Sequence, residues 1–115
     1  MKFTKHHLTP GEAFHLWHRQ SGLTERQIAD MYQVSPRTLR NWIRDKGTPP
    51  NVLSELPEPL PPWYICYTLR RRVGMTVRSM ARTFDVSFQT LSRWENGEAD
   101  WERLVEYYRK LGWDI

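Results

Sequence analysis

The sequence has few of the features that mark a secreted domain or a membrane protein. Its 115 residues include a single cysteine, Cys66, so no internal disulfide can form and a reducing compartment is expected. No apolar run approaches the roughly 20 residues that cross a bilayer, and the N-terminal MKFTKHHLTPGE lacks the apolar core of a signal peptide. The sequence thus predicts a cytoplasmic protein with no membrane partner.

Patterns typical of catalysis and metal binding are also missing. There is no glycine-rich phosphate loop, no Ser-His-Asp order and no recurring set of carboxylates. His15 and His18 are spaced to share one helix face, but no nearby cysteines or carboxylates complete a set of four ligands. We therefore expect no enzyme activity, no metal site, no cofactor and no small-molecule substrate.

Positive charge exceeds negative charge, and it is unevenly spread. The chain has 17 Lys+Arg against 13 Asp+Glu, a formal charge of +4 and an isoelectric point near 9.5. Six arginines and two acidic residues lie between Leu60 and Gly97, whereas five acidic and three basic residues follow. This excess suits a polyanionic partner, and the short chain favours a small binding fold over a large catalytic cleft.

Two stretches of the chain repeat each other. Gly22 aligns with Gly74, and the same offset of 52 positions holds without a gap as far as Trp42 and Trp94. Within this register the phrase VSPRTLRNW, residues 34–42, returns as VSFQTLSRW, residues 86–94. Such self-similarity indicates the internal duplication of one structural unit.

Helix start and stop signals recur in both copies, and no alternating strand pattern appears. In the first copy Thr9, Thr24 and Ser35 are predicted N-caps, and Gly22 is a predicted stop. The predicted helices cover residues 10–20, 25–32 and 36–46 in the first copy, and 62–72, 77–84 and 88–96 in the second. The predicted fold class is therefore all-α.

A fourth helix is predicted only after the second copy. It is capped by Asp100 and runs from Trp101 to about Leu111, whereas the equivalent first-copy segment is cut short by Pro57. Six of the eight prolines lie between residues 49 and 62, which predicts a semi-rigid linker. The expected organisation is a first domain at 1–56, a linker at 57–62 and a second domain at 63–115.

The third helix of each copy is predicted to have a buried and an outward face. Leu39 and Trp42 form the buried stripe of the first, as Leu91 and Trp94 do of the second. The outward positions carry Arg37, Arg40, Asn41 and Arg44 in the first copy, and Phe88, Gln89, Ser92, Arg93 and Asn96 in the second. Arginine and asparagine are the donors that read guanine and adenine edges, and an apolar side chain can contact a thymine methyl. The second face is less basic, so a protein partner there stays open.

Residues 74–97, GMTVRSMARTFDVSFQTLSRWENG, resemble the helix-turn-helix of the lambda-repressor-like, Cro-type family. The first copy, GLTERQIADMYQVSPRTLRNWIRDKG, is similar to the same family more loosely. The resemblance implies two tandem helix-turn-helix modules that bind double-stranded DNA as a transcriptional regulator, in particular a repressor. It also implies a phage or mobile-element context, and hence the cytoplasm of a bacterial or phage-infected cell.

The resemblance also implies which residues contact DNA. On the two recognition helices, 36–46 and 88–96, it implies base contacts from Pro36, Arg37, Asn41, Phe88, Gln89 and Arg93, and the outward face of the first of these helices adds Arg40. The expected phosphate contacts are Thr24, Arg26, Ser35, Thr38, Arg44, Thr76, Arg78, Ser87, Thr90 and Asn96. Two departures stand out: Glu25 and Val77 replace the family's common Gln, and Gln33 and Asp85 replace its turn Gly. We expect the first turn to be strained or rearranged, because Gln tolerates a positive φ poorly.

Two interpretations of the partner remain open. In the first, both modules of a single chain engage one DNA site, because residues 51–62 would span about 37 Å if extended, near the roughly 34 Å between major grooves on one DNA face. A helical start to this segment would shorten the span. The site is expected to be asymmetric because the outward residues of the two copies differ. A homodimer through the C-terminal helix is left open by Trp101, Tyr107, Tyr108 and Trp113. In the second interpretation, the chain is a protein-binding adaptor that docks a polymerase, replication or defence protein.

Overall fold

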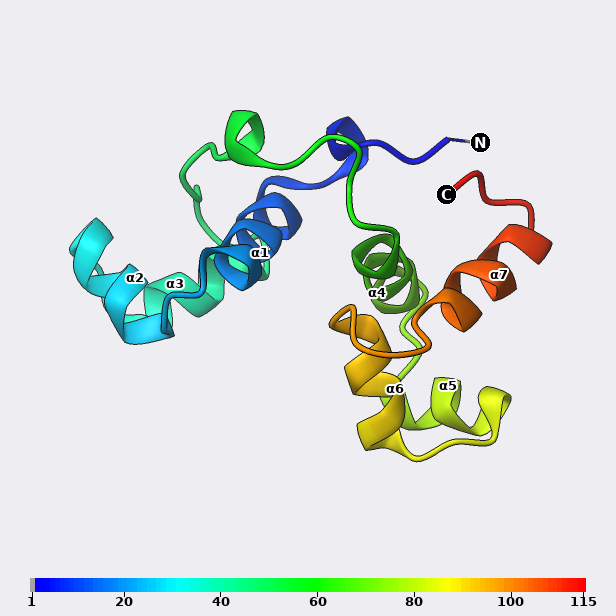
Figure 1. Cartoon of the computed structure of the whole chain (residues 1–115). Coiled ribbons are helices and arrows are strands. Elements are labelled where there is room, and N and C mark those ends of the chain that lie inside the picture. The colour runs from blue at the N-terminus through cyan, green and yellow to red at the C-terminus, as the bar shows by residue number, and fades with distance from the viewer. Residues whose placement is uncertain (1) are drawn as a thin grey trace. The chain divides into compact units, whose positions relative to one another are not determined.

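A computed structural model describes residues 2–115, which form helices joined by short loops (Figure 1). The α-helices are α1 (Pro10–Ser21), α2 (Glu25–Tyr32), α3 (Pro36–Ile43), α4 (Pro62–Arg72), α5 (Val77–Phe84), α6 (Phe88–Glu95) and α7 (Glu102–Lys110). Within residues 2–115, two 3-10 helices, η1 (Lys5–His7) and η2 (Leu53–Glu55), are the remaining helical elements. The all-α prediction is confirmed.

The chain divides into two compact units. The N-terminal unit comprises residues 4–59, and the C-terminal unit comprises residues 60–115 together with residues 2 and 3. The duplication is structural, because α5 and α6 begin and end 52 positions after α2 and α3. Gly22 and Gly74 mark the same point in each copy with φ values of 72° and 74°.

Aromatic rings dominate the core of the N-terminal unit. Here α1 and α2 pack on α3, and the buried cluster is Phe14, Ile28, Leu39 and Val52. Trp17, Tyr32 and Trp42 lie around Phe14, with ring centroids 5.5 to 6.1 Å apart. Val52 belongs to this core although it lies in the segment expected to be a spacer.

The segment expected to act as a spacer starts with a short helical turn. Residues 53–55 form the 3-10 turn η2, which is the short element that Pro57 was expected to end. Val52 and Leu56 are buried at 2% and 5% exposure. Because residues 52–56 pack or turn in this way, residues 51–62 are not fully extended, and the roughly 37 Å of an extended segment is an upper bound.

The predicted caps hold at most helix starts. Thr9, Thr24, Ser35, Thr76 and Ser87 each accept a hydrogen bond from the backbone N–H three residues on. The prediction was wrong for Asp100, which has a φ of 68° and does not cap α7. Its left-handed backbone turns the chain before the helix, a conformation that Asp tolerates, and Trp101 becomes the N-cap instead.

The helix expected at 36–46 ends three residues earlier, at Ile43. Asp45 takes a left-handed φ of 60°, and the Lys46 N–H donates to the Asn41 carbonyl across the end of α3. The Asp45 carboxylate then accepts from the Gly11 N–H at 2.7 Å and the Thr9 hydroxyl at 2.6 Å. A carboxylate is favourable at the N-terminus of α1. The end of α3 at Ile43 therefore allows Asp45 to stabilise the start of α1.

Gly11 and Asp45 lie too close for any larger residue at position 11. A Cβ on Gly11 would lie 2.5 Å from the Trp42 carbonyl oxygen and 2.8 Å from Asp45 Cγ. In the C-terminal unit the large and small residues are exchanged, since Trp63 occupies the position of Gly11, and Gly97 that of Asp45. A Cβ on Gly97 would lie 2.7 Å from Trp63 Nε1. The contact between the start of the first helix and the end of the third is therefore tight in both copies. The larger side chain comes from Asp45, after the third helix, in the N-terminal unit and from Trp63, in the first helix, in the C-terminal unit.

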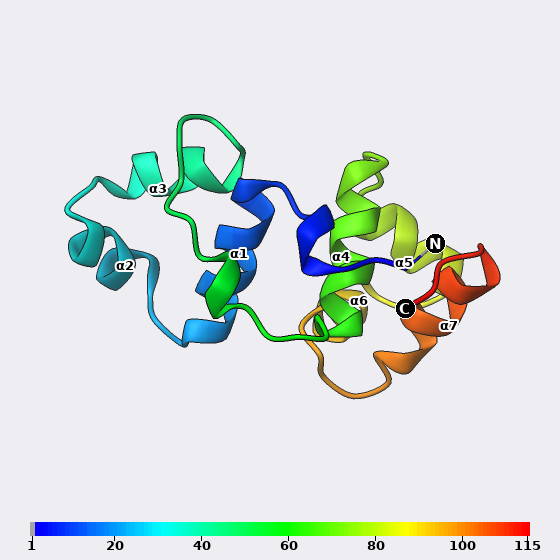
Figure 2. The same ribbon diagram turned by 90° about the horizontal axis from the view of Figure 1, so that it is seen from above.

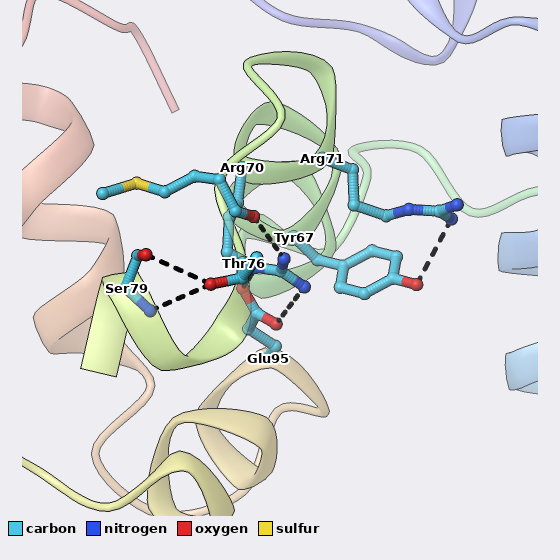
Figure 3. A network of polar contacts seen from close by, with 7 residues as sticks. Tyr67, Arg70, Arg71, Thr76, Ser79 and Glu95 are labelled. Carbon is cyan, nitrogen blue, oxygen red and sulfur yellow. Dashed lines mark hydrogen bonds and ion pairs between the residues drawn. The ribbon is translucent and has the colours of Figure 1, made fainter. Parts of the chain in front are cut away.

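A buried ion pair lies in the C-terminal unit, where α4 packs on α6 and α7. Arg70 of α4 and Glu95 of α6 are 6% and 4% exposed. Figure 3 shows the Arg70 guanidinium, which donates to both Glu95 oxygens at 2.7 and 3.0 Å and to the Met75 carbonyl at 2.8 Å. The pair fastens α4 to α6, the helix that carries the second outward face.

Residues 2 and 3 lie beside the C-terminal segment of the chain, in the C-terminal unit (Figure 2). Lys2 and Asp114 form a parallel β-bridge, and Phe3 is buried at 5% exposure with its ring 6.3 Å from that of Trp113. The Arg72 guanidinium lies 5.2 Å from the Phe3 ring centroid. The N-terminal unit is therefore linked at both of its ends to segments of the other unit.

Candidate nucleic-acid interface

The turn between the second and third helix has the same conformation in both copies. Gln33 has φ 56° and ψ 45°, and Asp85 has φ 54° and ψ 48°. In each turn the following valine N–H donates 3.0 Å to the alanine carbonyl five residues earlier, Ala29 or Ala81. The first turn is therefore not rearranged, and Gln33 occupies a backbone region that costs L-residues energy.

The outward face of α3 carries the predicted donors. Arg37 and Arg40 are exposed, and Asn41 is half-buried. Leu39 on the opposite face is fully buried. Arg44 is also exposed, but it lies just past the end of α3 as its C-cap. The helix thus presents guanidinium and carboxamide groups away from its core, which is the arrangement that base reading requires.

One of these donors is already paired. Arg40 Nη2 lies 2.8 Å from Glu25 Oε1 at the start of α2, with side chains 59% and 37% exposed. Glu25 is the position where the family commonly has Gln, so a carboxylate stands at this corner in place of an uncharged amide. This pairing was not predicted, although the opposite charges at the start of α2 and on the outward face of α3 are a signal for it. In the C-terminal copy neither charge is present, because Val77 and Ser92 occupy the positions of Glu25 and Arg40.

The outward face of α6 has a different character. Gln89, Arg93 and Asn96 are exposed, and Phe88 keeps 44% of its surface exposed. Ser92 is half-buried. The Arg78 guanidinium of α5 lies 5.3 Å from the Phe88 ring centroid. This face therefore combines an aromatic ring with amide and guanidinium donors.

The hydroxyls expected to contact phosphate cap helices or bond to a capping hydroxyl in the structure. Besides the caps at Thr24 and Ser35, the Ser35 and Thr38 hydroxyls lie 3.1 Å apart, as those of Ser87 and Thr90 do at 3.0 Å. Thr76 accepts from the Ser79 N–H, and its hydroxyl bonds that of Ser79 (Figure 3). The remaining candidates, Arg26, Arg78, Arg44 and Asn96, are exposed. The assignment of each residue to a base or a phosphate stays a prediction.

The described residues contain neither a candidate membrane span nor a candidate metal site. No helix within residues 2–115 has the length and apolar character that a membrane span needs. Across the described chain, His, Cys, Asp and Glu side chains form no group of three or more placed to hold a metal ion.

Comparison with known families matches each copy separately. Residues 12–51 match the model of a homeodomain-like domain, and residues 67–100 match that of a helix-turn-helix family. Neither the curated proteins nor the solved structures gave a match. A homeodomain is itself a three-helix variant of the helix-turn-helix, so both matches describe one kind of DNA-binding unit. The chain therefore carries two helix-turn-helix domains in tandem, of which the first matches the homeodomain-like model and the second the helix-turn-helix model.

Proposed function

We propose that this protein is a sequence-specific transcriptional regulator, and in particular a repressor, that places α3 and α6 in major grooves of double-stranded DNA. The observation that carries the proposal is the outward face of α3. Its Arg37 is exposed and its Asn41 half-buried, while Leu39 behind them is fully buried. These side chains suit guanine and adenine edges, and nothing in the core of the unit requires them there.

The two units are proposed to read different sequences. Arg37 and Asn41 act in the N-terminal unit, whereas Gln89, Arg93 and Phe88 act in the C-terminal unit. The scaffold is shared, but these outward residues differ between the copies. A single chain would therefore recognise an asymmetric site rather than a palindrome.

Repression would follow from occupancy. A chain bound across a promoter excludes the polymerase from the same DNA, in the cytoplasm of a bacterial or phage-infected cell. Linking two modules raises the effective concentration of the second once the first has bound, so two weak modules together can bind tightly. The phosphate contacts would come from the exposed first turns of the helices, through Arg26 and Arg78, and from Arg44 and Asn96.

Selection of binding sequences from a random duplex pool tests this function on the full chain. A discrete asymmetric motif is expected. The competing adaptor function predicts weak binding to all sequences, with a steep salt dependence and no motif. It draws support from the less basic outward face of α6 and its exposed Phe88. Enrichment of no sequence would therefore reject the regulator in favour of the adaptor.

The number of chains per site is tested separately. Of the aromatic residues that left a homodimer open, Tyr108 is buried within its own unit, and the Tyr107 ring lies 5.3 Å from that of Phe84. We therefore propose that one chain occupies one site. Light scattering of the complex, together with the length of its footprint, separates one chain from two.

A further inference from the structure

Phe88 is placed unlike the other apolar residues of its helix. It is the first residue of α6 and is 44% exposed, whereas Leu91 and Trp94 in the same helix are at most 3% exposed. In the N-terminal unit the corresponding residue is Pro36. A large apolar ring at the start of only one of the two recognition helices calls for a reason other than packing.

The surroundings of Phe88 form a shallow, open hollow that is lined by apolar side chains and two arginines. The hollow has a volume of about 250 Å³ and is lined by Arg78, Ala81, Arg82, Val86 and Phe88. Arg78 and Arg82 stand four residues apart on α5 and are both exposed. The Arg78 guanidinium lies 5.3 Å from the Phe88 ring centroid, a contact that restrains the ring.

Only one group in the major groove is apolar enough to pack against the Phe88 ring. Base edges there present hydrogen-bond donors and acceptors, with the C5-methyl of thymine as the apolar exception. The same methyl is present in 5-methylcytosine. Phosphates flank every base, so the guanidiniums of Arg78 and Arg82 are suited to bind the DNA backbone beside the methyl group. An apolar ring flanked by cations therefore complements a methylated pyrimidine within DNA.

We propose that the hollow at Phe88 receives the C5-methyl group of a pyrimidine, so that the C-terminal unit distinguishes a methylated from an unmethylated pyrimidine at one position. Phe88 makes the contact, and Arg78 is a positioning residue that holds the ring. The inference rests on the proposed DNA binding, and it adds the chemical group that one residue reads.

Replacing thymine by uracil isolates this contact, because it removes the methyl and nothing else. The random-duplex selection is run in parallel on two pools, one built with thymine and one with uracil. At one position of the motif, full-length protein is expected to bind the thymine duplex about fourfold more tightly. That ratio converts to about 0.8 kcal/mol, the value of one buried methylene-sized group.

Variants assign the preference to its residue. Phe88→Ala is expected to bind thymine and uracil duplexes equally, while Met31→Ala, which trims another exposed apolar side chain (53% exposed), keeps the fourfold ratio. Arg78→Gln is expected to lower the ratio without abolishing it. At the same position, 5-methylcytosine is expected to bind more tightly than cytosine if the hollow reads the methyl alone.

The outcomes separate this inference from the proposed function. A motif recovered equally from both pools overturns methyl reading and leaves the regulator intact. A thymine preference that persists in Phe88→Ala also overturns it, since another residue then reads the methyl. Equal binding of both pools with no motif rejects the inference and the regulator together. A Phe88-dependent preference for the thymine pool without a motif supports methyl reading alone.

Discussion

Arg70 and Glu95 form a two-pronged ion pair inside the C-terminal unit, with Nε to Oε2 at 2.7 Å and Nη2 to Oε1 at 3.0 Å. Both residues are nearly inaccessible to solvent. In the N-terminal copy the corresponding residues are His18 and Ile43. The two copies thus join their first and third helices by different chemistry, an ion pair in one and an aromatic core in the other.

Removing one partner of this pair is expected to destabilise the C-terminal unit strongly. Glu95→Gln leaves the Arg70 charge buried without its counter-ion, which costs about 3–5 kcal/mol. The double variant Arg70→Met with Glu95→Leu removes both charges and should unfold close to the wild type. Urea unfolding followed by tryptophan fluorescence measures each free energy. A double variant as unstable as Glu95→Gln would contradict this account.

The strained turn of the N-terminal unit offers a stabilising substitution. Gln33 has a φ of 56° and an exposed side chain, and a left-handed backbone costs an L-residue roughly 1–2 kcal/mol. Gln33→Gly is therefore expected to raise the free energy of unfolding by about 1 kcal/mol, after the entropy that glycine adds to the unfolded chain. Asp85→Gly, at the matching turn, should gain less because Asp tolerates this conformation. A loss of stability in Gln33→Gly would show that the turn carries no strain.

Base reading by α3 is tested by two truncations. Arg37→Ala and Asn41→Ala are each expected to cost about 1–3 kcal/mol on the selected site and to broaden the preference at one base pair. Arg44→Ala is the matched control, since loss of a phosphate contact weakens all sequences alike and reduces the salt slope by about one. Titration of fluorescent duplexes at several salt concentrations gives both quantities. An unchanged sequence preference after both truncations would exclude α3 as the reader.

The pair of Glu25 and Arg40 is expected to limit DNA affinity. Glu25→Gln keeps the shape of the side chain, removes a negative charge and frees Arg40, which the carboxylate now holds at 2.8 Å. Binding to all duplexes should become severalfold tighter, with a salt slope steeper by about one released counter-ion. Asp30→Asn removes another exposed carboxylate of α2 and serves as the control. Equal gains in both variants would attribute the effect to net charge rather than to Arg40. Because the pair is exposed, stability should change little.

Cys66 makes the stability of the C-terminal unit depend on alkaline pH. Burial, and next the nearby Glu95, raise the pKa of this thiol from 9.0 to about 12. Above pH 9 the unfolded thiol loses its proton while the folded one keeps it, so the free energy of unfolding falls as pH rises toward 12. The difference in stability between wild type and Cys66→Ala should therefore shrink between pH 8 and pH 10.5. Urea unfolding across this range measures the difference, and a constant difference would contradict the burial of the thiol.

The helices were predictable where the signals are local. The sequence predicts 25–32 and 77–84, and α2 and α5 have those bounds. Their Thr caps lie one residue before each helix and bind its first turn, so a few neighbouring residues decide the start. The end of α3 was missed because its cause is distant: Asp45 bonds Gly11, which lies 34 positions away in the sequence.

The candidate site was predictable only in part. The exposure of Arg37 and the burial of Leu39 follow from helical phase, which one segment defines. The Glu25–Arg40 pair and the hollow beside Phe88 depend on how two helices approach each other, which a single segment does not define. The Arg70–Glu95 pair could have been predicted, because each charge falls on the buried side of its helix and a buried charge needs a partner of opposite sign.

The two copies place the small and large residues of one helix–helix contact in opposite order, as Gly11 against Asp45 and as Trp63 against Gly97. This difference affects which helices of a duplicated chain can pack together. Two similar units on one chain invite each helix to dock on the partner meant for its twin. If α1 docked on α6, Gly11 would face Gly97 and leave a void. If α4 docked on α3, the Trp63 indole would collide with Asp45. Each first helix thus fits the third helix of its own copy, and the mismatch of side-chain sizes disfavours pairing with the third helix of the other copy.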